Sequence, residues 1–224
     1  MIFMSIEKAD LDKFQSAFSI DMNCKPDYNN CKLIIYNKFT IGGTLMNNKT
    51  RKLVLCALFA ALTAVCSQIA LVLPITQVPF NLATLAVFLA GGILGAGAGA
   101  VSQIVYILLG AIGVPVFAQF SGGFQVLIGP TGGYIFGYIA GAWTIGFLIS
   151  KFPKKNFLFY ALAMAVGLIA CYMLGTVWYM FVTKAALSAA LMLCVVPFLP
   201  VDALKMILAA FLCTRLAKHL KPIH

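Results

Sequence analysis

The chain has 224 residues, of which 62% are hydrophobic and 10% charged, and its mean hydropathy is +0.98. This composition excludes an ordinary soluble domain and indicates an integral membrane protein. The formal net charge is +10. The basic residues stand at the ends of apolar runs and not among aromatic side chains, which favours a role in membrane topology and argues against nucleic-acid binding.

The first segment, residues 1–45, is polar and differs from the rest of the chain. It holds every acidic residue except Asp202, and it lacks both an amphipathic repeat and the apolar core of a signal peptide. One interpretation is an artefact of start-site choice, because Ile41-Gly42-Gly43 can be encoded by a ribosome-binding sequence placed just before Met46. The alternative is a disordered cytosolic extension. The predicted domains are thus an extension over 1–45 and a membrane domain over 46–224.

The membrane domain opens with a long stretch, Leu53 to Ser150, that has no charged residue. One crossing needs roughly 20 apolar residues, so this stretch has room for four short crossings separated by proline-rich and glycine-rich breaks. Two more apolar runs follow. The sequence therefore predicts an all-α integral membrane protein with six transmembrane helices, near 52–73, 80–96, 99–114, 131–150, 157–182 and 195–216.

The basic residues of this domain set its predicted orientation. Three clusters, at 49–52, 151–155 and 215–221, flank the predicted helices, and cytoplasmic loops are enriched in lysine and arginine. An even number of crossings between the clusters places all three in the cytoplasm, with both termini inside and Lys184 outside. The breaks at 74–79 and 113–130 and the start of the last helix then meet near the external face.

Asp202 and Lys205 are the first candidates for a binding site. Their spacing of three places them on one face of the last helix, and a charge inside the bilayer costs about 2.5–3.5 kcal/mol on insertion scales. A structural alternative is that Asp202 caps the helix after Pro200 while Lys205 extends toward the membrane surface, or that the two form a local ion pair. A functional pair would offer an acceptor and a cation to a small polar molecule.

The loop between the third and fourth helices is the second candidate. It is too rich in glycine and proline for a continuous helix, and non-helical backbone at membrane depth is tolerated where it lines a cavity. An ordinary turn explains the same composition. The residues of this loop and of the following helix that we expect at a binding site are Phe117, Gln119, Phe120, Ser121, Gly122, Gly123, Thr131 and Tyr134.

Small residues recur every four positions on two helices. Ala57 with Ala61, and Ala60 with Ala64, form such steps on the first helix, and 133–141 contains a glycine series on the fourth. These faces favour close helix packing, either inside the bundle or against a partner. No metal, cofactor or catalytic site is predicted, since the cysteines lack metal-site spacing, both histidines lie in the C-terminal tail and no phosphate-binding loop is present.

Several motifs together resemble those of the BioY family, the biotin-binding S component of energy-coupling-factor (ECF) transporters. The resemblance runs from about Met46 to the C-terminus. It is carried by Pro79-Phe80-Asn81-Leu82-Ala83-Thr84, Gly113-Val114-Pro115-Val116-Phe117, Ser121-Gly122-Gly123, Gly129-Pro130-Thr131-Gly132-Gly133-Tyr134 and Pro200-Val201-Asp202-Ala203-Leu204-Lys205. Val201 stands where the family usually has glycine, and Ile135 stands where some members have arginine.

The resemblance implies a six-helix ECF S-component fold in the bacterial cell membrane and a non-enzymatic role in vitamin uptake. It implies biotin as ligand, with an EcfT-type coupling subunit and two EcfA-type ATPases as partners. Asp202, Lys205, Ser121 and Tyr134 would line the biotin site, and the alanine face of the first helix would contact the coupling subunit. An S component for another vitamin, an intramembrane enzyme and a structural subunit are the alternatives.

Overall fold

The computed structural model describes residues 48–71, 79–152 and 156–217, and the predicted extension over 1–45 lies outside these ranges. Two compact units divide the chain after Arg51, and the account below concerns the second. Its elements are helices, apart from two short strands. Their bounds are α3 (Asn48–Gln68), β1 (Ala70–Leu71), β2 (Phe80–Asn81), α4 (Ala83–Leu94), α5 (Ala96–Ala111), the 3₁₀ helix η1 (Ala118–Phe120), α6 (Phe124–Ile128), α7 (Gly132–Lys151), α8 (Phe157–Thr183), α9 (Leu187–Cys194) and α10 (Leu199–Ala217).

The predicted helices are found close to their predicted positions. The glycine-rich break separates α4 from α5 at Gly95, whose φ of 81° suits glycine. The sixth predicted helix, 195–216, starts later than expected, because α9 and α10 are separate helices bent by 53°. The first ends earlier than expected, at Gln68, because Ala70 pairs with Asn81 and Leu71 with Phe80 in a short antiparallel ladder.

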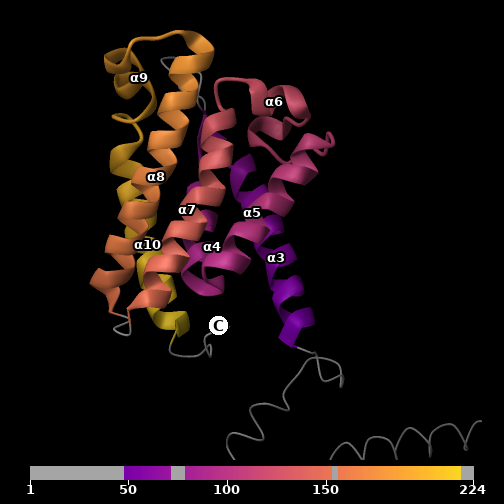
Figure 1. Cartoon of the computed structure of the whole chain (residues 1–224), viewed down its shortest axis with the longest axis vertical. Helices are drawn as coiled ribbons and strands as arrows, with labels where there is room; N and C mark the ends of the chain where they lie inside the picture. Colours follow the sequence, from indigo (N-terminus) through magenta and orange to yellow (C-terminus); the bar gives the residue numbers. More distant parts are fainter. Residues whose placement is uncertain (1–47, 72–78, 153–155, 218–224) are drawn as a thin grey trace, which may run out of the picture. The chain divides into compact units, whose positions relative to one another are not determined.

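Helix α7 forms the centre of the bundle. It packs against α8 on one side and against α4 and α5 on the other, and α10 packs against α4 and α8 (Figure 1). Small residues permit the close approach of α7 to α8: a Cβ at Gly137 would lie 2.9 Å from Cys171 Sγ, and one at Gly141 would lie 3.3 Å from Gly167 O. The predicted glycine face is therefore used for packing within the bundle.

Three of the described helices are long and apolar enough to cross a membrane: α3 from Thr50, α7 and α8. The bent pair α9 and α10 qualifies as a fourth span when taken together. Helices α4 and α5 are apolar but shorter. The C-terminal ends of α7 and α10 lie at one end of the bundle, and α6 and α9 lie at the other (Figure 1).

Candidate functional site

A cavity of about 210 Å³ lies where the loop after α5, the start of α4 and the start of α10 meet. The structure thus brings together two of the segments predicted near one membrane face, 113–130 and the start of the last helix, and of the third, 74–79, Pro79 lies in the described residues and lines the cavity. Most lining residues are apolar or aromatic, and a few polar groups converge among them, as is usual in small-molecule sites. The lining residues are Pro79, Asn81, Thr84, Tyr106, Phe117, Ala118, Gln119, Ser121, Val126, Thr131, Tyr134, Ile135, Tyr138, Cys171, Tyr172, Cys194, Phe198, Asp202 and Lys205.

Asp202 and Lys205 form a buried ion pair in the wall of this cavity. Lys205 Nζ lies 2.7 Å from Asp202 Oδ1, and the two residues are 5% and 2% exposed. Both belong to the first turns of α10. The carboxylate of Asp202 accepts hydrogen bonds from side chains of three helices and is not used as a cap of α10. The cap alternative and the extended lysine alternative therefore do not describe the structure, whereas the local ion pair does.

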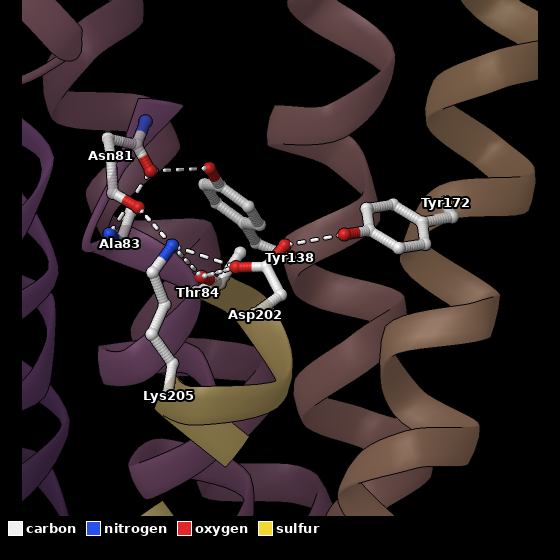
Figure 2. Close-up of polar contacts among 7 residues, drawn as sticks. All are labelled: Asn81, Ala83, Thr84, Tyr138, Tyr172, Asp202 and Lys205. Carbon is white, nitrogen blue, oxygen red and sulfur yellow. Dashed lines mark hydrogen bonds and ion pairs between the residues drawn. The ribbon is translucent and has the colours of Figure 1, made fainter. Parts of the chain in front are cut away.

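Each oxygen of the carboxylate has its own donors. Oδ1 accepts the Thr84 hydroxyl at 3.0 Å in addition to Lys205, while Oδ2 accepts the Tyr172 hydroxyl at 2.6 Å (Figure 2). Ionised carboxylates offer about four acceptor positions. Three are filled by the described residues, so Oδ2 retains one position for a further donor.

The ammonium group of Lys205 is held by three acceptors and one aromatic ring. It donates to the backbone oxygen of Asn81 at 2.6 Å and to Thr84 Oγ1 at 3.1 Å, besides its bond to Asp202. It also lies 4.8 Å from the centroid of the Phe80 ring, a favourable cation–π distance. An ammonium has three N–H donors, so its hydrogen-bonding capacity is filled within the chain.

The turn before α4 brings Asn81 to the site. Its side-chain oxygen accepts the backbone N–H of Ala83 at 3.1 Å, the local bond by which asparagine stabilises turns, and the Tyr138 hydroxyl at 3.5 Å (Figure 2). Among the described residues the side-chain nitrogen of Asn81 has no hydrogen-bond partner. Asn81 also lines the cavity.

The loop after α5 supplies the opposite wall. Phe117 is 1% exposed and packs edge-to-face on Tyr106 with ring centroids 5.5 Å apart. Gln119 and Ser121 also line the cavity, and Gln119 and Phe120 both have left-handed backbone, with φ of 60° and 54°. Gln68 fixes this conformation: its amide donates to the oxygens of Pro115 and Phe117, both at 3.1 Å, and accepts the N–H of Phe120 at 2.9 Å.

Three predicted site residues lie outside the cavity lining. Phe120 is 73% exposed and turns away from the cavity. Gly122 passes so close to Val114 that an added Cβ would lie 2.5 Å from its oxygen, and Gly123 has φ of 99° and donates to Gly110 O at 2.7 Å. These glycines shape the loop. The predicted residues that do line the cavity are Asp202, Lys205, Ser121, Tyr134, Phe117, Gln119 and Thr131.

The four alanines predicted as a partner face separate onto two sides of α3. Ala57 and Ala61 are exposed. Ala60 is 1% exposed within the core, and Ala64 packs against that core. The four alanines are therefore not one exposed surface: the two pairs lie about 60° apart around a helix of 3.6 residues per turn, and the edge of the buried face of α3 passes between them.

Sequence reasoning missed several lining residues with polar groups, namely Asn81, Thr84, Tyr106, Tyr138 and Tyr172. Asn81 and Thr84 were within a recognised motif, and their spacing of three was a usable signal. Tyr138 follows Tyr134 by one helical turn, which also indicates a common face. Tyr106 follows Ser102 and Gln103 by one helical turn, which marks a common buried face of α5. Tyr172 had no such signal, because α8 is apolar on all sides.

Comparison with known proteins gives concordant results. A sequence model of the BioY family matches residues 39–222. The biotin transporter BioY of Thermotoga maritima is 41% identical over 171 residues, which are 75% of this chain and 96% of that protein. The probable biotin transporter BioY of Pyrococcus horikoshii is 36% identical over 75% of this chain and 97% of its own length.

A solved structure agrees with these sequences. The crystal structure at 2.1 Å of the S-component for biotin from an ECF-type ABC transporter superposes with a TM-score of 0.74. The two chains are 26% identical, and the match covers 80% of this chain and 97% of that one. Family match, relatives and fold all coincide with the motifs around the cavity, and we conclude that the chain belongs to the BioY family.

Proposed function

We propose that this protein is the biotin-binding membrane subunit of an ECF-type vitamin uptake transporter. The observation that carries the proposal is the buried Asp202–Lys205 pair, placed with Asn81 in the wall of a small cavity in a BioY family chain. The function is binding and delivery, not chemistry. Biotin is the transported ligand, and no cofactor is part of the proposal.

The chemistry of the cavity suits a cyclic urea. The bicyclic end of biotin has two N–H donors and one carbonyl acceptor. In our proposal the open acceptor position of Asp202 Oδ2 takes a ureido N–H, and the side-chain amide of Asn81 donates to the ureido carbonyl. Tyr134, Phe117 and Phe198 supply apolar walls for the sulfur-containing ring. Gln119, Ser121 and Thr131 complete the polar part of the lining.

We further propose six crossings with both termini in the cytoplasm of a bacterial cell. Helices α4 and α5 are short, yet counting each as a crossing leaves Lys52, Lys151 and Arg215 on the same side, as the distribution of basic residues in cytoplasmic loops requires. The cavity then faces outward, where an imported vitamin arrives.

The proposed partners are an EcfT-type coupling subunit and two EcfA-type ATPases, which would supply the energy for release to the cytoplasm. We assign the contact with the coupling subunit to the exposed Ala57 and Ala61 on α3, because small exposed residues let a second helix approach closely. Ala60 and Ala64 support this face from inside.

A vitamin panel tests the proposal. A ligand that binds only the folded state raises its stability, by about 2.7 kcal/mol at one hundred times Kd. We expect biotin to raise the melting temperature of the purified full chain in detergent, and riboflavin and thiamine to leave it unchanged. A shift with another vitamin would indicate an S component of different specificity, and no shift with any vitamin would favour an enzyme or a structural subunit.

A further inference from the structure

The charged groups in the cavity lining indicate which end of a ligand the cavity can bind. Among the described lining residues, Asp202 and Lys205 are the only charged ones, and they neutralise each other at 2.7 Å. A ligand carboxylate at this cavity would therefore meet no unpaired cation, unless Lys205 left its present partners.

Moving Lys205 to a ligand would break a filled network. All three of its donors are engaged, with Asp202, Asn81 O and Thr84 Oγ1. Turning the ammonium away would leave the Asp202 carboxylate buried without its counter-charge, and removing one partner of a buried pair is strongly unfavourable. The same lysine is consequently a poor partner for a carboxylate at the other end of the ligand.

The other residues that the structure describes offer no substitute near the cavity. The sequence from Leu53 to Ser150, which contributes both the loop after α5 and the start of α4, has no charged residue. Lys184 is exposed at the end of α8 and is absent from the cavity lining. Lys151 and Arg215 lie in the last turns of α7 and α10, at the end of the bundle away from α6 and α9 (Figure 1).

The lining also changes with depth. Asp202 and Lys205 are almost fully buried, whereas Gln119 is exposed, and Ser121 and Thr131 are half-buried. The cavity volume of about 210 Å³ is below the roughly 300–1,000 Å³ of sites that enclose a drug-sized ligand. An elongated ligand whose head lay at the buried pair would extend its other end toward this neutral rim.

We infer that the cavity recognises the cyclic-urea end of its ligand in depth and leaves the carboxyl end at the rim without a cation. The chain would then bind neutral carboxamides of biotin about as well as biotin itself. This inference rests on the proposed function and extends it to a ligand class that keeps the bicyclic urea and lacks the negative charge.

Biotinamide is the sharpest probe, because it replaces one carboxylate oxygen by NH₂ with almost no change of size. We expect calorimetric titration of the purified full chain in nanodiscs to give dissociation constants for biotin and biotinamide within about threefold of each other. A cation paired with the carboxylate would instead make biotinamide roughly ten- to a hundredfold weaker, and that result would overturn the inference.

Two controls separate the possible failures. Biotin methylated on a ureido nitrogen should bind at least about tenfold more weakly, which shows that the assay detects the loss of one hydrogen bond to a charged group. Lys184→Gln should leave the ratio of the two dissociation constants unchanged. A Lys184→Gln protein that loses affinity for biotin but not for biotinamide would contradict the inference, while failure of biotin itself to bind would remove the proposed function instead.

Discussion

Asp202 and Lys205 show how two charges can be accommodated within an apolar bundle. Burial of either charge alone is costly, and the pair is tolerated because each charged atom also has well-placed hydrogen bonds. Tyr172 and Thr84 donate further hydrogen bonds to the carboxylate, and the ammonium donates one to Asn81 O. The pair is therefore part of the fold as well as of the proposed site, and an experiment must separate these two roles.

Single and double substitutions achieve this separation. Asp202→Asn or Lys205→Met alone should lower the free energy of unfolding by about 3–5 kcal/mol, because each leaves one buried charge unpaired. The double variant removes both charges and should recover most of that loss. Its affinity for biotin should remain at least about tenfold below that of the parent chain, because a charged acceptor is missing. Stability is measured by thermal unfolding and affinity by calorimetry; a double variant with parental affinity would make the pair purely structural.

At the scale of single residues, the sequence predicted charged groups better than neutral ones. Asp202 was conspicuous as the one acid after residue 45. Tyr172, which makes a 2.6 Å bond to it, was not, because α8 is apolar around its whole circumference and its inward face cannot be recognised from periodicity. Phe120 was placed in the site because its neighbours are there, and the left-handed backbone that turns it outward depends on Gln68.

Among the helices, the sequence predicted positions well where proline, glycine or charge marks an end. The break at Val195–Phe198 was missed although Pro197 lies within it, because the apolar run on either side continues through the proline. The pairing of β1 with β2 was missed as well, because it joins residues that are well separated in sequence and depends on tertiary contact. The contact of α7 with α8 was one of two options that the glycine series left open.

Glycine substitutions test that contact. Gly137→Ala should destabilise the chain by about 1–3 kcal/mol, because the added carbon would lie 3.0 Å from the backbone oxygen of Cys171, which cannot move independently of α8. Gly97→Ala in α5 is the matched control, since nothing lies within 4 Å of its added carbon. It should leave stability unchanged or raise it by up to ~1 kcal/mol. Equal melting temperatures for the two variants would contradict the tight α7–α8 packing.

For the molecule as a whole, the distribution of basic residues predicts an orientation that can be measured. In a cysteine-free background, Lys184→Cys should react with a membrane-impermeant maleimide added to intact cells. Lys151→Cys should react only after the cells are opened, because the two positions terminate helices at opposite ends of the bundle. Labelling of both in intact cells would exclude the six-crossing topology.

The last turn of α3 has a role beyond its own stability. Ser67 donates to Val116 O and Gln68 holds three backbone groups of the cavity loop, while Ala57 and Ala61 of the same helix are exposed. Helix α3 therefore connects its exposed face at Ala57 and Ala61 to the cavity wall that contains Phe117 and Gln119. In the proposed function, a coupling subunit that shifted α3 on docking would change the affinity for the vitamin. Thermodynamic reciprocity then requires bound vitamin to change the affinity for that subunit by the same factor.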